Sequence, residues 1–360
     1  MEQRQRKSEC LGYFHLARGL GMILIVAGHS VNLFYSPGHG YGLFAGAGSV
    51  LGGGIIAMFF MISGFGFYRR SPGKCFSIQK KLLLRPYYLT AAAVLATKLL
   101  LAIGKKRSFL EHGGELILTY LFGLNAEGGG SFLGIPIESV SILWFLLALF
   151  GGWILYNQIM QFRSENLQAV MILLCILCSF VLIRLSKVWP FCFPMGLQAV
   201  GYLAAGDQIR KRNLLEKKLP VWMWGLLILG TAAAAFGEVN MVAGIWRFGL
   251  LDLAGSFCVG FLLLRLYAGW KNRVDGGKVT AVIEEIGFCS IWVVCLHAYE
   301  KIIFPWHRLA WIFPDQPWLC VILGFCGRCV VMYLMYLILV FGKRKWKRWK
   351  KKRRKVRITK

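Results

Sequence analysis

The sequence predicts an all-α integral membrane protein, a bundle of about ten transmembrane helices with both termini in the cytoplasm. Composition and patterning predict this fold class. Of the 360 residues, 57% are hydrophobic and only 16% are charged, whereas an average soluble domain carries about 25% charged residues. The apolar residues fall in runs of roughly 18 to 25, the length of a bilayer-spanning helix. A soluble globular enzyme is excluded.

Ten apolar runs form the candidate spans. The first begins at Leu11, is too long for the apolar region of a signal peptide and lacks a small-residue cleavage pattern, so we expect it to be retained. The candidate spans are residues 11–35, 43–67, 82–103, 139–160, 167–185, 193–209, 219–236, 243–268, 281–304 and 318–342.

The distribution of Lys and Arg predicts the topology. An even number of spans puts both termini on one side, and that side carries 30 Lys and Arg, against 6 on the other. Because cytoplasmic loops are enriched in Lys and Arg, both termini are predicted to be cytoplasmic. We expect a multi-pass protein of the cell (plasma or inner) membrane, with no nucleic-acid partner despite the net charge of +27.

The segments between the spans leave no room for a soluble domain. The stretch 109–124 is too short and too polar to span, so we expect an interfacial or re-entrant helix there. The transmembrane domain is predicted over 1–342 and a polybasic cytoplasmic tail over 343–360. The tail holds 13 of the 43 Lys and Arg, together with Trp346 and Trp349, a pattern typical of a segment that binds anionic lipid.

Cysteine and glycine are interpreted as packing residues. Nearly all of the eleven Cys lie inside apolar runs, where Cys behaves as a small hydrophobic residue, and we predict no metal site. The glycines of the stretch 42–54 are expected to let helices approach closely.

Ionisable side chains inside the spans are the main functional candidates, because burying them in lipid is costly. Arg18 and His29 both lie in the first predicted helix. Eleven residues at 100° each put the two on nearly the same helix face, roughly 16 Å apart along the axis. Arg18 could neutralise a phosphate at the inner surface, and His29 could accept a proton from a hydroxyl.

These two residues stand in a recognisable motif. The segment Ala17–Ser30, with Arg18 followed eleven residues later by His29 in a Gly-His-Ser setting, resembles the first-helix motif of the acyltransferase family 3 membrane O-acyltransferases. Met58–Phe65 resembles the family's Phe-Phe-x-Ile-Ser-Gly-Phe signature, and Lys81–Tyr87 its Arg-Leu-Leu-x-Pro-Tyr segment. Later segments resemble the fucose O-acetylase-like branch of the family: Leu143–Leu146, Gly201–Leu203 and Leu296–His297.

The resemblance implies a reaction. An acyl group, commonly acetyl, would pass from acyl-CoA in the cytoplasm to a hydroxyl of an extracytoplasmic glycan, a lipid-linked sugar or another acceptor of the bacterial cell envelope. Acyl-CoA would be a substrate, and no bound cofactor is expected. The resemblance gives His29 the role of general base, and Arg18 would support the donor or the histidine.

Further site residues are expected around this pair. The basic residues Arg69, Arg70, Lys81 and Arg85 face the cytoplasm in the predicted topology and could bind the phosphates of acyl-CoA. The family segment has its Arg four residues before Pro, a position that Leu82 holds here, so either Lys81 or Arg85 could be the equivalent cation. Possible accessory residues are His297, Trp144 and Ser63.

Two other classes of function remain open. A transporter or a flippase for an envelope glycan or lipid would also use buried charges, although the spacing of the spans shows no duplicated halves. A membrane subunit without turnover of its own would keep Arg18 and His29 as structural residues. Loss of acylation on replacement of His29 would separate the enzyme from both.

Overall fold

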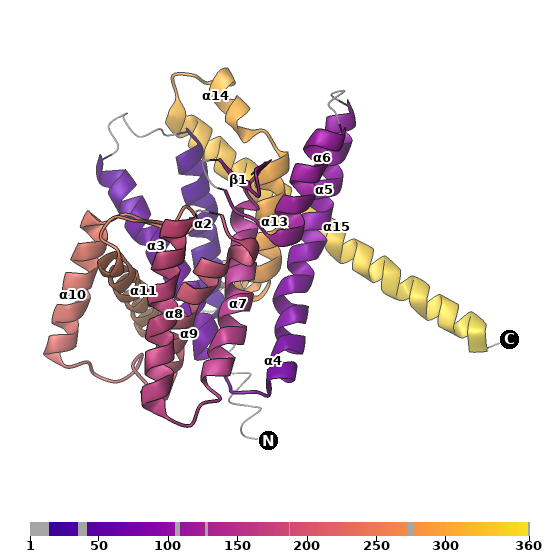
Figure 1. The fold of residues 1–360 in the computed structure, drawn as a ribbon. Helices are drawn as coiled ribbons and strands as arrows, with labels where there is room; N and C mark the ends of the chain where they lie inside the picture. Colours follow the sequence, from indigo (N-terminus) through magenta and orange to yellow (C-terminus); the bar gives the residue numbers. More distant parts are fainter. Residues whose placement is uncertain are drawn as a thin grey trace.

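The computed structural model describes residues 14–34, 42–104, 109–126, 129–186, 188–271 and 277–358, and in these ranges the chain is almost entirely helical (Figure 1). The elements in chain order are α2 (His15–Phe34), α3 (Gly42–Phe65), α4 (Pro72–Gln79), the π-helix η1 (Lys80–Leu84), α5 (Arg85–Gly104), α6 (Phe109–Phe122), β1 (Gly130–Phe132), β2 (Ile135–Ile137), η2 (Ser141–Leu143), α7 (Trp144–Ile159), α8 (Glu165–Leu185), η3 (Pro190–Cys192), α9 (Phe193–Lys211), α10 (Val221–Phe236), β3 (Val239–Asn240), β4 (Ile245–Trp246), α11 (Leu250–Lys271), α12 (Lys278–Phe288), α13 (Ser290–Ile303), η4 (Trp306–Arg308), α14 (Leu309–Ile312) and α15 (Pro317–Ile358).

The predicted helical membrane protein is confirmed. In the described ranges, six helical segments are long and apolar enough to cross a membrane, and α12 with α13 forms a seventh candidate, bent by 78°. Each of the ten predicted runs contains a helix, but α10 and the apolar part of α3 are short, and α9 is not among the candidate spans. The count of ten spans and the cytoplasmic termini stay predictions.

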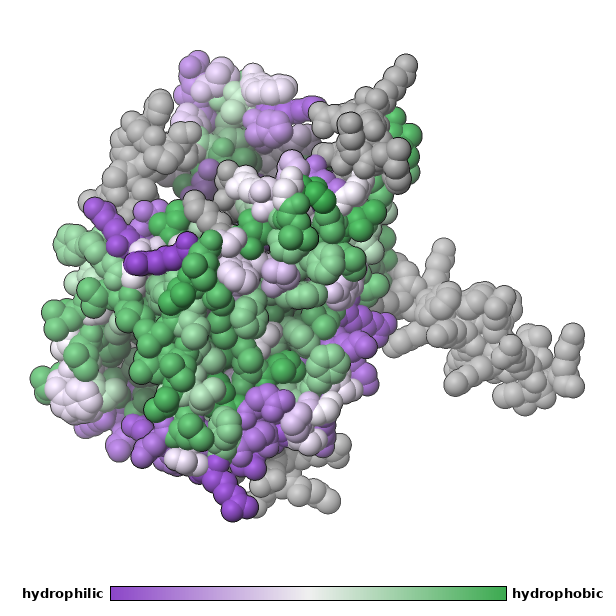
Figure 2. Space-filling view, in the orientation of Figure 1, coloured by the Kyte–Doolittle hydropathy of each residue, from purple (hydrophilic) through white to green (hydrophobic). Residues whose placement is uncertain are grey.

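The outer surface agrees with this class. On the face shown in Figure 2, hydrophobic residues cover a broad band across the middle of the molecule, and hydrophilic residues gather mainly toward its two ends. Side chains such as Leu229, Leu100 and Ile338 are 67%, 69% and 70% exposed. In water so large an apolar surface would drive aggregation, whereas in a bilayer it contacts lipid.

Small residues bring the central helices into contact. α9 packs between α3, α7 and α8, and a Cβ atom on its Gly206 would lie 2.0 Å from the carbonyl oxygen of Met61 in α3. Gly287 of α12 approaches the His15 carbonyl of α2 as closely. In the predicted glycine-rich stretch, Gly54 of α3 packs against Val259 of α11, while Gly52 faces open space. Glycines therefore set the close approach of three helix pairs, as expected for small residues in membrane helices.

The eighth apolar run is not helical throughout. Its first residues form strand β4 of the antiparallel hairpin β3–β4, and α11 starts only at Leu250. Gly244 and Gly249 adopt φ of +66° and +60°, a conformation that glycine favours and that interrupts a helix. Arg247 is consequently exposed outside the helix, whereas Asp252 is buried in the first turn and accepts a hydrogen bond from the Phe248 backbone N–H.

The segment between α5 and α7 forms a small subdomain. The predicted non-spanning helix is present as α6, which packs on α5 and is held by a hydrogen bond of 2.7 Å from the Tyr87 hydroxyl to the Tyr120 carbonyl. The loop after α6 contains the antiparallel hairpin β1–β2, which turns at Gly134 with φ of +78°. Its position at a membrane interface stays a prediction.

Candidate functional site

His29 lies in a cluster of polar side chains within the bundle. It stands on α2 and is partly exposed, about 21 Å along the axis from the first residue of that helix. The ring of His297 on α13 lies beside it, with the two ring centroids 5.4 Å apart and the planes inclined by 49°. The structure thus brings together the predicted catalytic histidine and one predicted accessory residue, 268 positions apart in the sequence.

Glu300 connects this pair to the surrounding helices. His297 and Glu300 are both completely buried, and Nδ1 of His297 lies 2.6 Å from Oε1 of Glu300, one helical turn further along α13. Oε2 of Glu300 accepts a hydrogen bond from the indole N–H of Trp306 in η4. Arg328 of α15, 1% exposed, lies with Nε 3.9 Å from Oε1. These five residues, His29, His297, Glu300, Trp306 and Arg328, are called the histidine cluster below.

Three members of the histidine cluster, Glu300, Trp306 and Arg328, were missed by sequence reasoning. Glu300 follows His297 by three residues, a spacing that places both on one helix face. Arg328 is an isolated cation in an otherwise apolar run, which is the general sign of a functional or paired charge in a membrane helix. The spacing could have identified the first residue, but no local pattern says that the two meet.

Arg18 does not join the histidine cluster. It stands on the same face of α2 as His29 but three turns away, and buried Met22 occupies the face between them. Arg18 is half-buried, and no residue in the described part of the chain forms a hydrogen bond or an ion pair with its guanidinium. The structure therefore places the two predicted catalytic residues at different levels of the bundle.

Ser63 and Trp144 have contacts that fix packing. The hydroxyl of Ser63 accepts a hydrogen bond of 2.8 Å from the indole N–H of Trp153. Trp144 is 4% exposed and meets Phe145 edge to face, with centroids 6.1 Å apart. Both residues belong to the interior of the bundle, and neither has a hydrogen bond or ring contact with the histidine cluster within the described ranges.

The four predicted donor-binding cations lie along α4, η1 and the segment before them. Arg69, Lys81 and Arg85 are exposed. Arg70 is half-buried, exchanges two backbone hydrogen bonds of 3.0 Å with the Asn157 side chain, and its guanidinium lies 6.0 Å from the Trp153 ring centre. Arg69, Lys81 and Arg85 are therefore accessible to a ligand, whereas the contacts of Arg70 with α7 hold it in place.

A π-helical turn changes the position of the cations within the segment Lys81–Tyr87, which resembles the family's Arg-Leu-Leu-x-Pro-Tyr segment. Residues Lys80–Leu84 form the π-helix η1, in which the Arg85 backbone N–H bonds the Lys80 carbonyl, five residues back. One turn of a π-helix takes up more residues than one α-helical turn. Lys81, five residues before Pro86, therefore comes close to the place that a cation four residues before Pro would take in a regular α-helix.

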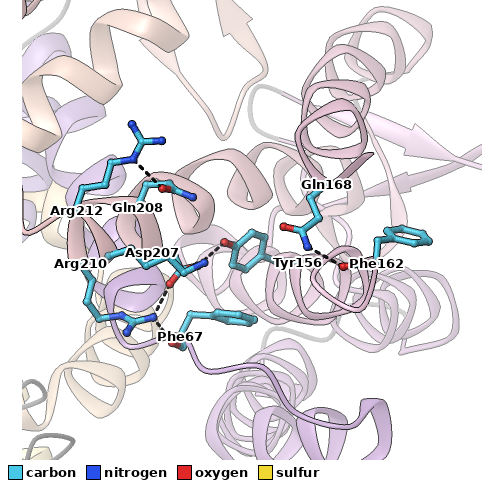
Figure 3. A network of polar contacts seen from close by, with 9 residues as sticks. Phe67, Tyr156, Phe162, Gln168, Asp207, Gln208, Arg210 and Arg212 are labelled. Carbon is cyan, nitrogen blue, oxygen red and sulfur yellow. Dashed lines mark hydrogen bonds and ion pairs between the residues drawn. The ribbon is translucent and has the colours of Figure 1, made fainter. Parts of the chain in front are cut away.

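A second polar network, which sequence reasoning did not find, lies near these cations (Figure 3). Asp207 of α9 is completely buried and accepts hydrogen bonds from the Tyr156 hydroxyl at 2.9 Å and from Arg210 at 2.6 Å. Lys211 lies 2.8 Å from the same carboxylate, and Arg210 also donates to the Phe67 carbonyl at 3.0 Å. The network ties the end of α3, and so the segment carrying Arg69, to α7 and α9.

In the described residues, no group of three or more His, Cys, Asp or Glu side chains could hold a metal ion. The two Cys pairs with two intervening residues, Cys175 with Cys178 and Cys326 with Cys329, consist of free thiols.

The fold and the site define a multi-pass helical membrane protein with a buried carboxylate–histidine pair next to a partly exposed histidine. Residues 11–350 match the model of the acyltransferase domain, acyltransferase family 3. The chain therefore belongs to this family and is a membrane acyltransferase. Neither the curated proteins nor the solved structures contain a significant match to it.

Proposed function

We propose that this protein is an O-acyltransferase that moves an acyl group, acetyl in the first instance, from cytoplasmic acyl-CoA to a hydroxyl of an extracytoplasmic glycan or another envelope acceptor. The observation that carries the proposal is the position of His29. It is partly exposed within the bundle and lies beside the buried His297–Glu300 pair, as a general base supported by other polar groups would be.

In the proposed reaction, His29 activates the acceptor. The O–H bond of the acceptor breaks, its proton passes to the imidazole of His29, and the oxygen forms a bond to the carbonyl carbon of the thioester. The carbon–sulfur bond then breaks, and the departing thiolate of CoA takes the proton back from His29. The histidine returns to its neutral form, and no external oxidant, reductant or bound cofactor is needed.

The donor would bind from the cytoplasmic side. Lys81, Arg85 and Arg69 are exposed cations at the end of the bundle where α2 begins, and cations pair favourably with the phosphates of CoA. The π-helical turn favours Lys81 as the equivalent of the family's cation. Arg18, half-buried and without a bonded partner among the described residues, stands between this end and His29 and would contact the acyl-CoA or the histidine.

The proposal also includes an orientation of the protein in the membrane. With ten spans, both termini lie in the cytoplasm and the histidine cluster faces the outer half of the cell membrane. α15 is 42 residues long, about twice the length needed to cross a bilayer, so the helix continues beyond the membrane. The 13 basic residues at 343–360 would bind anionic lipid at the inner surface.

The test is transfer of labelled acetyl from acetyl-CoA in membranes that contain the protein. We expect label to enter the glycan or lipid fraction with the wild-type chain and His29→Ala to lower the rate by about 10²–10⁴-fold, the range for loss of a general base. His307→Ala is the matched control, because His307 is an exposed histidine in η4 and should leave transfer unchanged. Equal transfer by wild type and His29→Ala would contradict the role of His29 and would favour a transporter.

A further inference from the structure

Two completely buried titratable groups, His297 and Glu300, lie behind His29. His297 and Glu300 have no exposed surface, whereas His29 is partly exposed. A substrate hydroxyl can therefore reach His29, but His297 can contact only protein atoms in this arrangement. Any contribution of His297 and Glu300 to the proposed reaction has to pass through His29.

The hydrogen bond to Glu300 fixes the proton on His297. Oε2 of Glu300 accepts a hydrogen bond from Trp306, and the Arg328 guanidinium lies near Oε1, so donors face both oxygens. With Glu300 as the acceptor, Nδ1 of His297, 2.6 Å from Oε1, carries the hydrogen. In a neutral imidazole the other nitrogen, Nε2, is then an acceptor. This atom is buried and has no hydrogen-bond partner among the described residues. A buried acceptor without a donor is unusual and calls for a functional explanation.

His29 can supply a donor to this acceptor. With ring centroids 5.4 Å apart, facing nitrogens of two imidazoles are about 3 Å apart when they point at each other, which is a normal hydrogen-bond distance. Turning the His29 ring toward Nε2 of His297 would make this bond. The second nitrogen of His29 would then be the unprotonated one and would face the accessible side.

Glu300 itself is held from two other elements. The indole of Trp306 donates to one carboxylate oxygen, and Arg328 lies near the other. Among the described residues, the cations Lys301 and Arg328 lie near both histidines, and Glu300 lies next to His297. Glu300 is thus the negative charge that opposes a build-up of positive charge when His29 takes a proton.

We propose that Glu300 and His297 are positioning residues that act through His29, forming a carboxylate–histidine–histidine relay. This inference rests on the proposed function. In the relay, one N–H of His29 donates to Nε2 of His297, whose Nδ1–H donates to Glu300. The relay fixes the tautomer of His29 and stabilises the imidazolium that forms when the acceptor proton is removed. The acceptor proton itself stays on His29 until it passes to the CoA thiolate.

The test uses the full-length protein in membranes and varies the concentration of labelled acetyl-CoA. Glu300→Gln keeps the size of the side chain and removes its charge. We expect the maximal rate to fall on the order of 100-fold while the KM for acetyl-CoA stays within roughly twofold, because the relay acts on the transition state and not on donor binding. His297→Gln should give the same result. Folded protein is quantified by size-exclusion chromatography in each case.

A double variant tests whether Glu300 acts through His29. In the His29→Ala background, adding Glu300→Gln should cost no further activity, since residues that act as a unit are non-additive. Asp252→Asn is the matched control. Asp252 is another completely buried carboxylate, on α11, and Asn keeps an oxygen to accept the Phe248 N–H. It should retain the wild-type rate.

The outcomes separate the relay from the proposed function. If His29→Ala abolishes transfer but folded Glu300→Gln or His297→Gln works at the wild-type rate, the relay is wrong and the proposed function stands. An additive loss in the double variant also overturns the relay. If His29→Ala transfers acetyl as well as wild type does, the proposed function fails, and the relay fails with it.

Discussion

The residues of the proposed reaction lie at two different depths of the bundle, the histidine cluster at one and the donor-binding cations at the other. At one level, His29 lies beside His297, which pairs with Glu300, and Arg328 lies near the same carboxylate. At the other level, the exposed cations Arg69, Lys81 and Arg85 lie along the segment after α3, η1 and the start of α5, and Arg210 links the first of these segments to Asp207. This separation suits a reaction whose donor is polyanionic and whose acceptor is a hydroxyl, because phosphate binding requires accessible positive charge and general base catalysis requires a histidine able to stay neutral.

A prediction at this scale concerns the donor site. Lys81→Ala should raise the KM for acetyl-CoA about tenfold, equivalent to 1.4 kcal/mol, and leave the maximal rate nearly unchanged, because a phosphate contact is made equally in ground and transition states. The measurement is acetyl transfer as a function of acetyl-CoA concentration. Lys74→Ala, which removes an exposed lysine of α4, serves as the control. A raised KM in Arg85→Ala with no change in Lys81→Ala would reassign the site to Arg85.

At the scale of elements, close helix contacts and two irregular turns shape the site. The glycines of α9 and α12 let these helices touch the backbones of α3 and α2. The break at Cys289 between α12 and α13 redirects the chain by 78°. α13 then runs beside α2 and α15, which brings His297 next to His29. The π-turn at Lys80–Leu84 similarly moves the cations of α4 and α5 relative to a regular helix.

The glycine contacts lead to a stability prediction. In Gly206→Ala the new methyl group would meet the Met61 carbonyl oxygen at 2.0 Å, so the helices must separate, and we expect a loss of about 1–3 kcal/mol, as for other overpacked sites. Thermal unfolding in detergent measures the effect as a lower melting temperature. Gly225→Ala in α10, where a Cβ meets nothing within 4 Å, should be neutral or stabilising by up to about 1 kcal/mol. Equal melting temperatures for the two variants would show that α3 and α9 are not in such close contact.

The face of the molecule shown in Figure 2 has the surface expected of a membrane protein, with an apolar band between two hydrophilic ends. Its excess of Lys and Arg lies on the side that the predicted topology assigns to the cytoplasm. The same assignment places the hairpin β1–β2 outside and the turn between α9 and α10 inside. The proposed direction of acyl transfer depends on this orientation.

Reporter fusions test the orientation. Green fluorescent protein fused after Lys360 should fluoresce, because it folds in the cytoplasm, and alkaline phosphatase inserted between β1 and β2 should be active, because it requires an oxidising compartment. Alkaline phosphatase inserted at 213–218, after α9, should be inactive. An active enzyme at this position together with an inactive one at the hairpin would reverse the topology and place the donor site outside.

The class of protein could be predicted from the sequence alone. A span must be apolar to lie in lipid, and its length must match the thickness of the bilayer, so both properties can be read from the chain without knowing its fold. The motif around Arg18 and His29 was sufficient to indicate the family, which the match over residues 11–350 shows. Sequence reasoning also chose His297 as a possible accessory residue, without a partner or a function for it.

Which residues meet depends on how the helices pack, and this could not be predicted from the sequence. Glu300 and Arg328 stand on different helices, and their contact depends on the bend between α12 and α13 and on the packing of α15. The Asp207 network likewise joins α7, α9 and the end of α3. Helical periodicity predicts which residues share a face of one helix, but it contains no information on which helices are neighbours. The packing of small residues over the full length of the chain sets those neighbours.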